Sequence, residues 1–140
     1  MAILTYLQAI TMALDEEMER DEKMFIIGQD VGKRGGVFLA TDGLYDKYGE
    51  DRVSDAPLAE SAIAGVGIGA AMYGMRPIAE IQFADFIMPA VNQIISEAAK
   101  IRYRSNNDWN CPITIRAPYG GGVSGGLYHS QSVEAIFANQ

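Results

Sequence analysis

Hydrophobic positions along the chain switch repeatedly between the spacing of a helix and that of a strand. Apolar residues recur every three or four positions over residues 7–18, after Thr5, which can cap a helix. The compact apolar run of residues 24–27, before Gly28, is instead typical of a buried strand. The same changes of period predict further strands at residues 52–55, 77–82 and 112–116, and helices at residues 40–48, 58–73 and 86–104.

Three of the later helices carry specific expectations. Residues 58–73 are apolar all round, which predicts a helix buried on every side. For residues 86–104, Asp85 is available as the N-cap. The predicted buried stripe of that helix consists of Ile87, Val91, Ile94, Ala98 and Ile101. A glycine-rich loop, residues 117–130, then leads to a last predicted helix.

Strands separated by helices predict an α/β fold, a parallel sheet with helices on both faces. In such sheets, ligands bind beyond the carboxyl ends of the strands. Here those ends include residues 55–58, residues 82–86 and the loop 117–130. We therefore expect one α/β domain over residues 1–140, with any binding site built from these segments.

Composition narrows the classes of partner. The 140 residues carry a formal charge of −7, which argues against nucleic acid, since affinity for phosphates depends on Lys and Arg. The longest uncharged run, residues 61–75, is too short and too rich in glycine to span a bilayer about 30 Å thick. The N-terminus lacks the features of a signal peptide, and Cys111 is the single cysteine. We therefore expect a cytoplasmic protein that contacts neither nucleic acid nor membrane.

Three glycines inside the predicted helix 58–73 need an explanation. Gly65-x-Gly67-x-x-Ala70 formally fits a dinucleotide-binding fingerprint, but that motif belongs at a strand-to-helix turn and not inside a helix. Each glycine in a helix costs about 1 kcal/mol relative to alanine. Gly65, Gly67 and Gly69 therefore indicate another helix crossing closely, such as one from a partner subunit.

Two side chains are candidates for chemistry. Glu60 is the only acid in its apolar helix, so it is either a solvated first-turn carboxylate, favoured by the helix dipole, or one kept among apolar groups to hold a proton. His129 is the only histidine, and it follows the glycine loop 120–126, which lacks the Lys-Ser/Thr of a P-loop. A metal site is not expected, because no second His or Cys lies at ligand spacing.

Several stretches together resemble a known family. DEEMERDEKMFIIGQDVG, PLAESAIAGVGIGAA, RPIAEIQFADF, EAAKIRYRS and LYHSQS resemble, in order, the β subunit of the decarboxylating component of 2-oxo acid dehydrogenase complexes. AEIQFADF and GLYHSQS are most similar to the branched-chain 2-oxo acid enzymes. The resemblance implies a thiamine-diphosphate-binding fold, with this chain as its pyrimidine-binding domain. The family's second α/β domain would then be absent, so we expect an N-terminal fragment.

The resemblance also implies roles for individual residues. Glu60 matches the glutamate that hydrogen-bonds N1′ of the aminopyrimidine and so promotes deprotonation of the thiazolium. Phe86 matches the aromatic residue that stacks on the pyrimidine ring, and Leu58 and Gln82 match positions that line the same pocket. His129 matches the histidine that points at the reacting centre and assists acyl transfer. Ser124 departs from the family, since many relatives carry histidine there.

Cofactor and partners follow from the same resemblance. The chain lacks the Gly-Asp-Gly motif that binds the diphosphate and Mg²⁺, so these groups would be held mainly by an α subunit in an α2β2 heterotetramer. The substrate would be a small 2-oxo acid, and the acyl group would pass to a lipoyl arm of the acyltransferase component. The isolated chain is expected to be inactive. Two alternatives stay open: a pyruvate or acetoin dehydrogenase β subunit, and a non-catalytic flavodoxin-like binding or assembly module.

Overall fold

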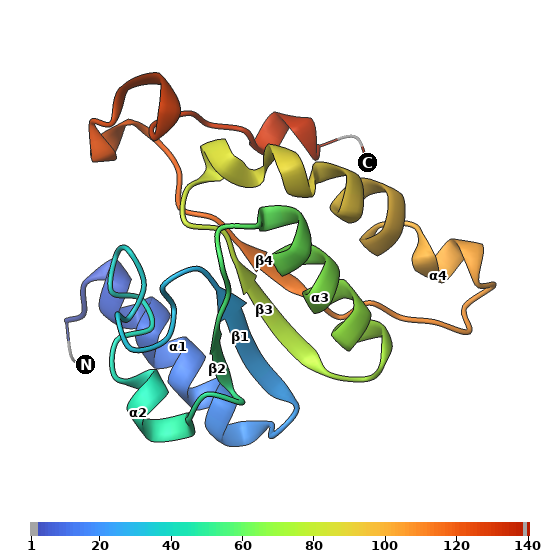
Figure 1. The fold of residues 1–140 in the computed structure, drawn as a ribbon, viewed down its shortest axis with the longest axis horizontal. Helices are drawn as coiled ribbons and strands as arrows, with labels where there is room; N and C mark the ends of the chain where they lie inside the picture. Colours follow the sequence, from blue (N-terminus) through green and yellow to red (C-terminus); the bar gives the residue numbers. More distant parts are fainter. Residues whose placement is uncertain (1–2, 139) are drawn as a thin grey trace.

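The sheet at the centre of the molecule consists of parallel strands in the order β2-β1-β3-β4 (Figure 1). A computed structural model describes residues 3–138 and 140. The strands are Met24–Gly28 (β1), Val53–Asp55 (β2), Arg76–Glu80 (β3) and Thr114–Arg116 (β4). The α-helices are Tyr6–Arg20 (α1), Leu44–Tyr48 (α2), Glu60–Met72 (α3) and Ile101–Arg104 (α4). Shorter 3₁₀ and π segments are Ala84–Ala90 (η1), Gln93–Ala98 (η2), Gly121–Val123 (η3), Gly126–Tyr128 (η4) and Glu134–Ile136 (η5).

Helix α1 begins where the sequence predicts. The Thr5 hydroxyl accepts a hydrogen bond from the Gln8 backbone N–H, at 3.2 Å, and the Gln8 side chain accepts one from the Thr5 N–H, at 2.9 Å. This capping box satisfies two of the donors that a helix N-terminus leaves unpaired. Leu14 and Met18, on the inner face of the helix, are buried in one core cluster with residues of β1 and β2.

Helices cover both faces of the sheet, as the alternation of periods predicts. Ile26 and Ile27 of the central strand β1 point to opposite faces, because side chains alternate along a strand. Ile26 packs with α1 and α2, whereas Ile27 packs against the cluster of α3, β3 and η1. Figure 1 shows these two layers on either side of the strands. The α/β fold class is therefore confirmed, and no helix in the described part of the chain is long and apolar enough to cross a membrane.

The prediction that residues 58–73 form a helix buried on every side is wrong for the chain as described. Helix α3 begins at Glu60 and buries a single face, formed by Ile63, Ala64, Gly67, Ile68 and Ala71. Its other face is exposed at Val66, and Tyr73, which follows the helix as its C-cap, is exposed as well. Apolar composition alone does not say which positions of a helix meet a neighbour, because that depends on tertiary packing.

The three glycines of α3 differ in their surroundings. A Cβ at Gly67 would lie 2.9 Å from Ile113 Cδ1, so the chain itself requires a bare backbone there. At Gly65 and Gly69, a Cβ would have no neighbour within 4 Å. Close packing inside the chain therefore explains one of the three glycines, and the other two lie on the open face.

The segment predicted as one helix over residues 86–104 is irregular. It starts at Ala84 as a 3₁₀ segment that contains Pro89, continues through the π segment η2, and ends in α4 after a turn at residues 99–100. Proline lacks the N–H that a regular helix would use, which favours such irregularity. Asp85 is not the N-cap, because that position belongs to Phe83.

Two further helices are shorter in the structure than the sequence predicts. The predicted helix at residues 40–48 is helical over Leu44–Tyr48 only, after turns at residues 41–43. The last predicted helix, after the glycine loop, is a single 3₁₀ turn at Glu134–Ile136 among the residues described. Val133 and Phe137 beside that turn pack against the α3 side of the core.

Replacing Gly65 with alanine should raise the free energy of unfolding of the chain by about 1 kcal/mol, because helical alanine is favoured and nothing lies within reach of the added methyl group. Gly67→Ala is the matched variant, and it should gain less, because the Ile113 side chain must move. Urea denaturation of both variants measures the difference. An equal gain in both would contradict the packing of Gly67 against Ile113.

Candidate active site

The carboxyl ends of the four strands lie level at one edge of the sheet. Gly28 of β1 is in register with Asp55 of β2 on one side and with Glu80 of β3 on the other. Glu80 is in turn in register with Arg116 of β4. The segments that leave the strands therefore start side by side, and these are the segments in which the sequence places its candidate residues.

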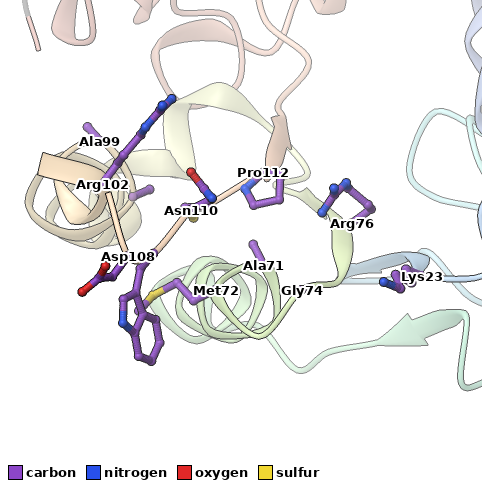
Figure 2. A pocket seen from close by; sticks show the side chains of 13 residues that line it. Lys23, Ala71, Met72, Gly74, Arg76, Ala99, Arg102, Asp108, Asn110 and Pro112 are labelled. Atoms are coloured by element: carbon purple, nitrogen blue, oxygen red, sulfur yellow. The ribbon is translucent and has the colours of Figure 1, made fainter. Parts of the chain in front are cut away.

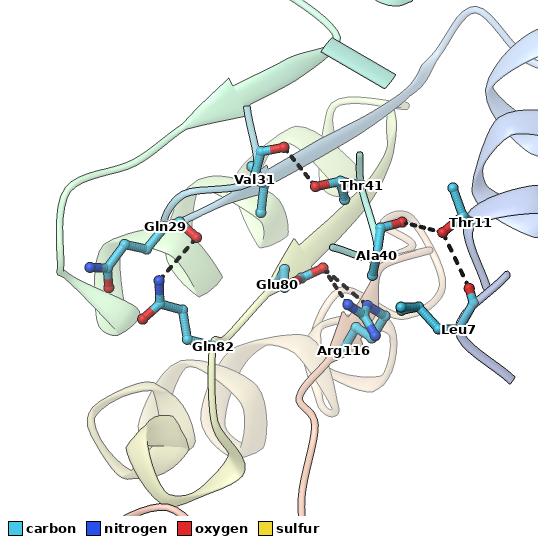
Figure 3. Close-up of polar contacts among 9 residues, drawn as sticks. All are labelled: Leu7, Thr11, Gln29, Val31, Ala40, Thr41, Glu80, Gln82 and Arg116. Atoms are coloured by element: carbon cyan, nitrogen blue, oxygen red, sulfur yellow. Dashed lines mark hydrogen bonds and ion pairs between the residues drawn. The ribbon is translucent and has the colours of Figure 1, made fainter. Parts of the chain in front are cut away.

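A buried ion pair joins β3 to β4 in this row. Both Nε and Nη2 of Arg116 donate to Glu80 Oε2, at 3.0 and 2.8 Å, as Figure 3 shows. The Glu80 side chain is only 5% exposed, and that of Arg116 is 20% exposed. Two donors to one carboxylate fix the relative orientation of the two side chains, which makes this pair a rigid connection between the strand ends.

Further hydrogen bonds hold the loop that follows β1 (Figure 3). The buried Thr41 hydroxyl donates to the Val31 carbonyl, at 2.7 Å, and closes the loop on itself. Gln82, just after β3, donates from Nε2 to Asp30 Oδ2 at 2.8 Å and to the Gln29 carbonyl at 3.4 Å. Gln82 thus faces the loop after β1, and it does not line the pocket that contains Glu60.

Glu60 lines a small pocket at this edge. The pocket has a volume of about 360 Å³, and its lining residues are Leu58, Glu60, Asp85, Phe86 and Pro89. Glu60 is half-buried at the first position of α3, and its carboxylate has no hydrogen-bond or ion-pair partner among the residues that the structure describes. A carboxylate set between apolar walls without a partner is free to bind a donor supplied by a ligand.

Asp85 is a second carboxylate of the pocket that sequence reasoning did not select as a site residue. Its two oxygens accept from the Gln131 backbone N–H, at 3.3 and 3.4 Å. Asp85 therefore connects the Glu60 pocket with the end of the loop 117–130. Its position in FADF, a few residues beyond the end of a predicted strand, is the feature that could have identified it.

His129 lies against two phenylalanines, one of which, Phe86, also lines the Glu60 pocket. Its ring centroid is 4.7 Å from that of Phe83 and 5.2 Å from that of Phe86, in edge-to-face geometry. Phe86 thus contributes to the Glu60 pocket and also contacts His129. Of the five residues named from the sequence, Leu58, Glu60, Phe86 and His129 are brought together in this way, and Gln82 lies on the side of the β1 loop.

The pocket suits part of a thiamine cofactor. Leu58, Phe86 and Pro89 provide the apolar surface that a flat heterocycle needs, and the Glu60 carboxylate can accept from a ring N–H. No Lys or Arg lines the pocket, so it offers nothing to neutralise a diphosphate. Within the described part of the chain, no three His, Cys, Asp or Glu side chains come together as metal ligands. The fit is therefore to the aminopyrimidine end of the cofactor.

A wider pocket, of about 770 Å³, lies elsewhere, where α3 ends and β3 begins (Figure 2). Lys23, Arg76 and Arg102 contribute its positive charge, and Asp108 and Trp109 also line it. This pocket contains none of the candidate residues. Pocket volume alone would therefore have pointed to the amino ends of the strands, far from the edge at which Glu60 and His129 meet.

Fold and pocket together define a parallel α/β domain with a candidate pocket at the carboxyl edge of its sheet. Residues 3–139 match the family model described as "Transketolase, pyrimidine binding domain". The chain therefore belongs to this family of pyrimidine-binding domains.

Individual relatives are longer than this chain. It is 77% identical over 140 residues to the 2-oxoisovalerate dehydrogenase subunit beta of Bacillus subtilis, covering 100% of this chain and 43% of that protein. It is 54% identical over 134 residues to the protein of the same name from Pseudomonas aeruginosa, covering 96% of this chain and 38% of that one. The pyruvate dehydrogenase E1 component subunit beta of Bacillus subtilis is 47% identical over 140 residues. The chain thus spans about two fifths of the length of these relatives.

Replacing Arg116 with methionine should lower the free energy of unfolding by about 3 kcal/mol, because it leaves the Glu80 carboxylate buried without its partner. The double variant Glu80→Leu/Arg116→Met should recover most of this loss. Arg20→Met, which removes an exposed ion pair with Glu17, is the control and should change stability by less than about 1 kcal/mol. A cost for Arg116→Met no larger than that of the control would contradict a stabilising role for the buried pair.

Proposed function

We propose that this chain is the pyrimidine-binding part of the β subunit of a branched-chain 2-oxo acid dehydrogenase. In this proposal, the complete enzyme decarboxylates a 2-oxo acid oxidatively and passes the acyl group to a lipoyl arm of the acyltransferase component. The observation that carries the proposal is the half-buried, unpartnered Glu60 carboxylate beside Phe86 at the carboxyl edge. The 77% identity to a 2-oxoisovalerate dehydrogenase β subunit supports the choice of a branched-chain substrate.

Each residue of the pocket has a specific part in this proposal. The Glu60 carboxyl group would share one proton with a ring nitrogen of the aminopyrimidine through a hydrogen bond, and so would control the protonation of that ring. Phe86 and Leu58 exclude water from the ring, and Phe86 offers it an aromatic face. Thiamine diphosphate, when bound, supplies the electron sink for loss of CO₂. His129, in ring contact with Phe86, assists the transfer of the acyl group.

The proposal requires an α subunit. The Glu60 pocket has no cationic side chain, so the diphosphate and Mg²⁺ are assigned to residues of an α chain in an α2β2 assembly. The open face of α3 around Gly65 and Gly69 can accept a closely packed helix, because no described residue lies within 4 Å of a Cβ built there. We assign that face to contact with another subunit. The 140-residue chain alone is then inactive.

Glu60→Ala in a full-length β chain, assembled with its α partner, should lower decarboxylation by at least about 100-fold, because the proton-holding group is gone. Glu60→Gln tests charge at nearly constant shape, and it should lose a similar factor. Glu16→Ala, which removes an exposed carboxylate on α1, is the control and should keep normal activity. The rate of decarboxylation is measured with an artificial electron acceptor. Near-normal turnover in both Glu60 variants would contradict the proposed mechanism.

Substrate preference tests the second half of the proposal. The assembled enzyme should use 3-methyl-2-oxobutanoate with a kcat/KM at least about tenfold above that for pyruvate, since each additional buried methyl group is worth about that factor or more. Steady-state kinetics with both substrates measures the ratio. A preference for pyruvate would contradict the branched-chain assignment and favour a pyruvate dehydrogenase β subunit. The proposed role of Glu60 would be unaffected.

A further inference from the structure

The loop of residues 120–131 holds His129 differently from its other residues. Residues 121–128 are all exposed, whereas His129 and Ser130 are half-buried. A mobile, glycine-rich loop would leave an exposed imidazole in many orientations. The change of exposure at His129 therefore indicates that specific contacts hold this side chain, and we call the residues that make these contacts its seat.

Two phenylalanines form one side of the seat. The His129 ring meets Phe83 at an interplanar angle of 85° and Phe86 at 83°, so both contacts are edge-to-face. Aromatic pairs in this geometry contribute more than their buried area alone. Phe83 is the closer of the two. Its ring is also in edge contact with that of Phe38, at a centroid distance of 5.5 Å, and this second contact restrains it.

Gly125 forms the other side. A Cβ built on Gly125 would lie 2.4 Å from His129 Cβ and 3.2 Å from its Cγ. The backbone angle φ of Gly125 is −89°, which every residue adopts easily, so only the space occupied by His129 requires glycine here. Because the conflict is at Cβ, a change of side-chain rotamer cannot relieve it, and the backbone of His129 would have to move.

Hydrogen bonds close the loop around this contact. The Gly125 N–H donates to Ser130 Oγ at 2.9 Å, and the Gly120 N–H donates to the Gln131 carbonyl at 3.3 Å. The Gln131 N–H in turn donates to the Asp85 carboxylate on η1. His129 is therefore held from both directions along the chain, and its seat is tied to the same segment that carries Phe83 and Phe86.

We propose that Gly125 and Phe83 are positioning residues that together orient the His129 imidazole for acyl transfer. This inference rests on the proposed function, and it adds residues to which that function assigns no role. Neither residue needs to touch the substrate or the cofactor. A misplacement of a catalytic group by about 1 Å can cost about 100-fold in rate, so a seat of this kind has measurable consequences.

The test uses the full-length β chain assembled with its α partner. Gly125→Ala should slow acyl transfer to a lipoyl domain by at least about tenfold, with the KM for that domain unchanged and decarboxylation within about twofold of normal. Gly122→Ala, in the same loop but with no neighbour within 4 Å of its added methyl group, is the matched control and should transfer normally. Gly125→Ala combined with His129→Asn should be no slower than His129→Asn alone.

Phe83 is tested separately, with a readout that does not depend on turnover. Phe83→Tyr keeps the ring and should transfer normally, whereas Phe83→Leu should behave like Gly125→Ala. In histidine-labelled protein, the His129 ring-proton resonance, assigned by its disappearance in His129→Asn, should move in Gly125→Ala and in Phe83→Leu but not in Gly122→Ala. Loss of the ring currents of Phe83 is the physical reason for the shift in Phe83→Leu.

Three results would overturn the inference. The first is normal transfer and an unmoved His129 resonance in Gly125→Ala. The second is normal transfer in His129→Asn, and the third is an equal loss of decarboxylation and transfer in Gly125→Ala. Normal transfer in His129→Asn would also remove the role that the proposed function gives to His129, whereas the other two results concern Gly125 alone. None of the three touches the role of Glu60, which is judged by decarboxylation in the Glu60 variants.

Discussion

The parallel register of the four strands is the constraint on which the candidate site depends. Asp55, Gly28, Glu80 and Arg116 form one row across the sheet, so every loop that leaves the sheet at this end starts at the same level. Gly28 allows this alignment to be tight, since a Cβ there would lie 2.7 Å from the Glu80 carbonyl oxygen. The Glu80–Arg116 ion pair then fixes β4, one of the two edge strands of the described sheet, against its neighbour β3. Without this row, the segments that carry the candidate residues would not converge.

The sequence was sufficient to predict the elements whose pattern is local. Period and capping located α1, and short apolar runs located β1 and β3, because these features depend on neighbours a few residues apart. The irregular segment from Ala84 to Arg104 was not predictable in the same way. Its apolar stripe fits a regular helix, and the departure arises where Pro89 and the packing against α3 compete with regular hydrogen bonding.

The sequence was sufficient to name most residues of the candidate site, but not to predict which of them contact one another. Glu60 and His129 stood out as the only acid in an apolar helix and the only histidine of the chain. Their common neighbour, Phe86, could be named from the resemblance, but its simultaneous contact with the pocket and with His129 is a tertiary fact. The contact made by Asp85 could not be predicted from the sequence either. A carboxylate before a helical segment looks like a cap, yet it accepts from the backbone of Gln131, 46 residues away in the chain.

The two candidate groups are held by different physical means, which follows from their places in the fold. Glu60 is on a helix whose buried face is anchored to β3 by Ile63 and Ala64, so its position is set by the core. His129 is on a loop whose residues 121–128 are all exposed, so its position must come from specific contacts such as those with Phe83 and Gly125. In the proposed function, a carboxylate held by the core suits a group that would stay against one bound ring. In the proposed function, the contacts with Phe83 and Gly125 would orient the His129 imidazole without any change in the core that holds Glu60.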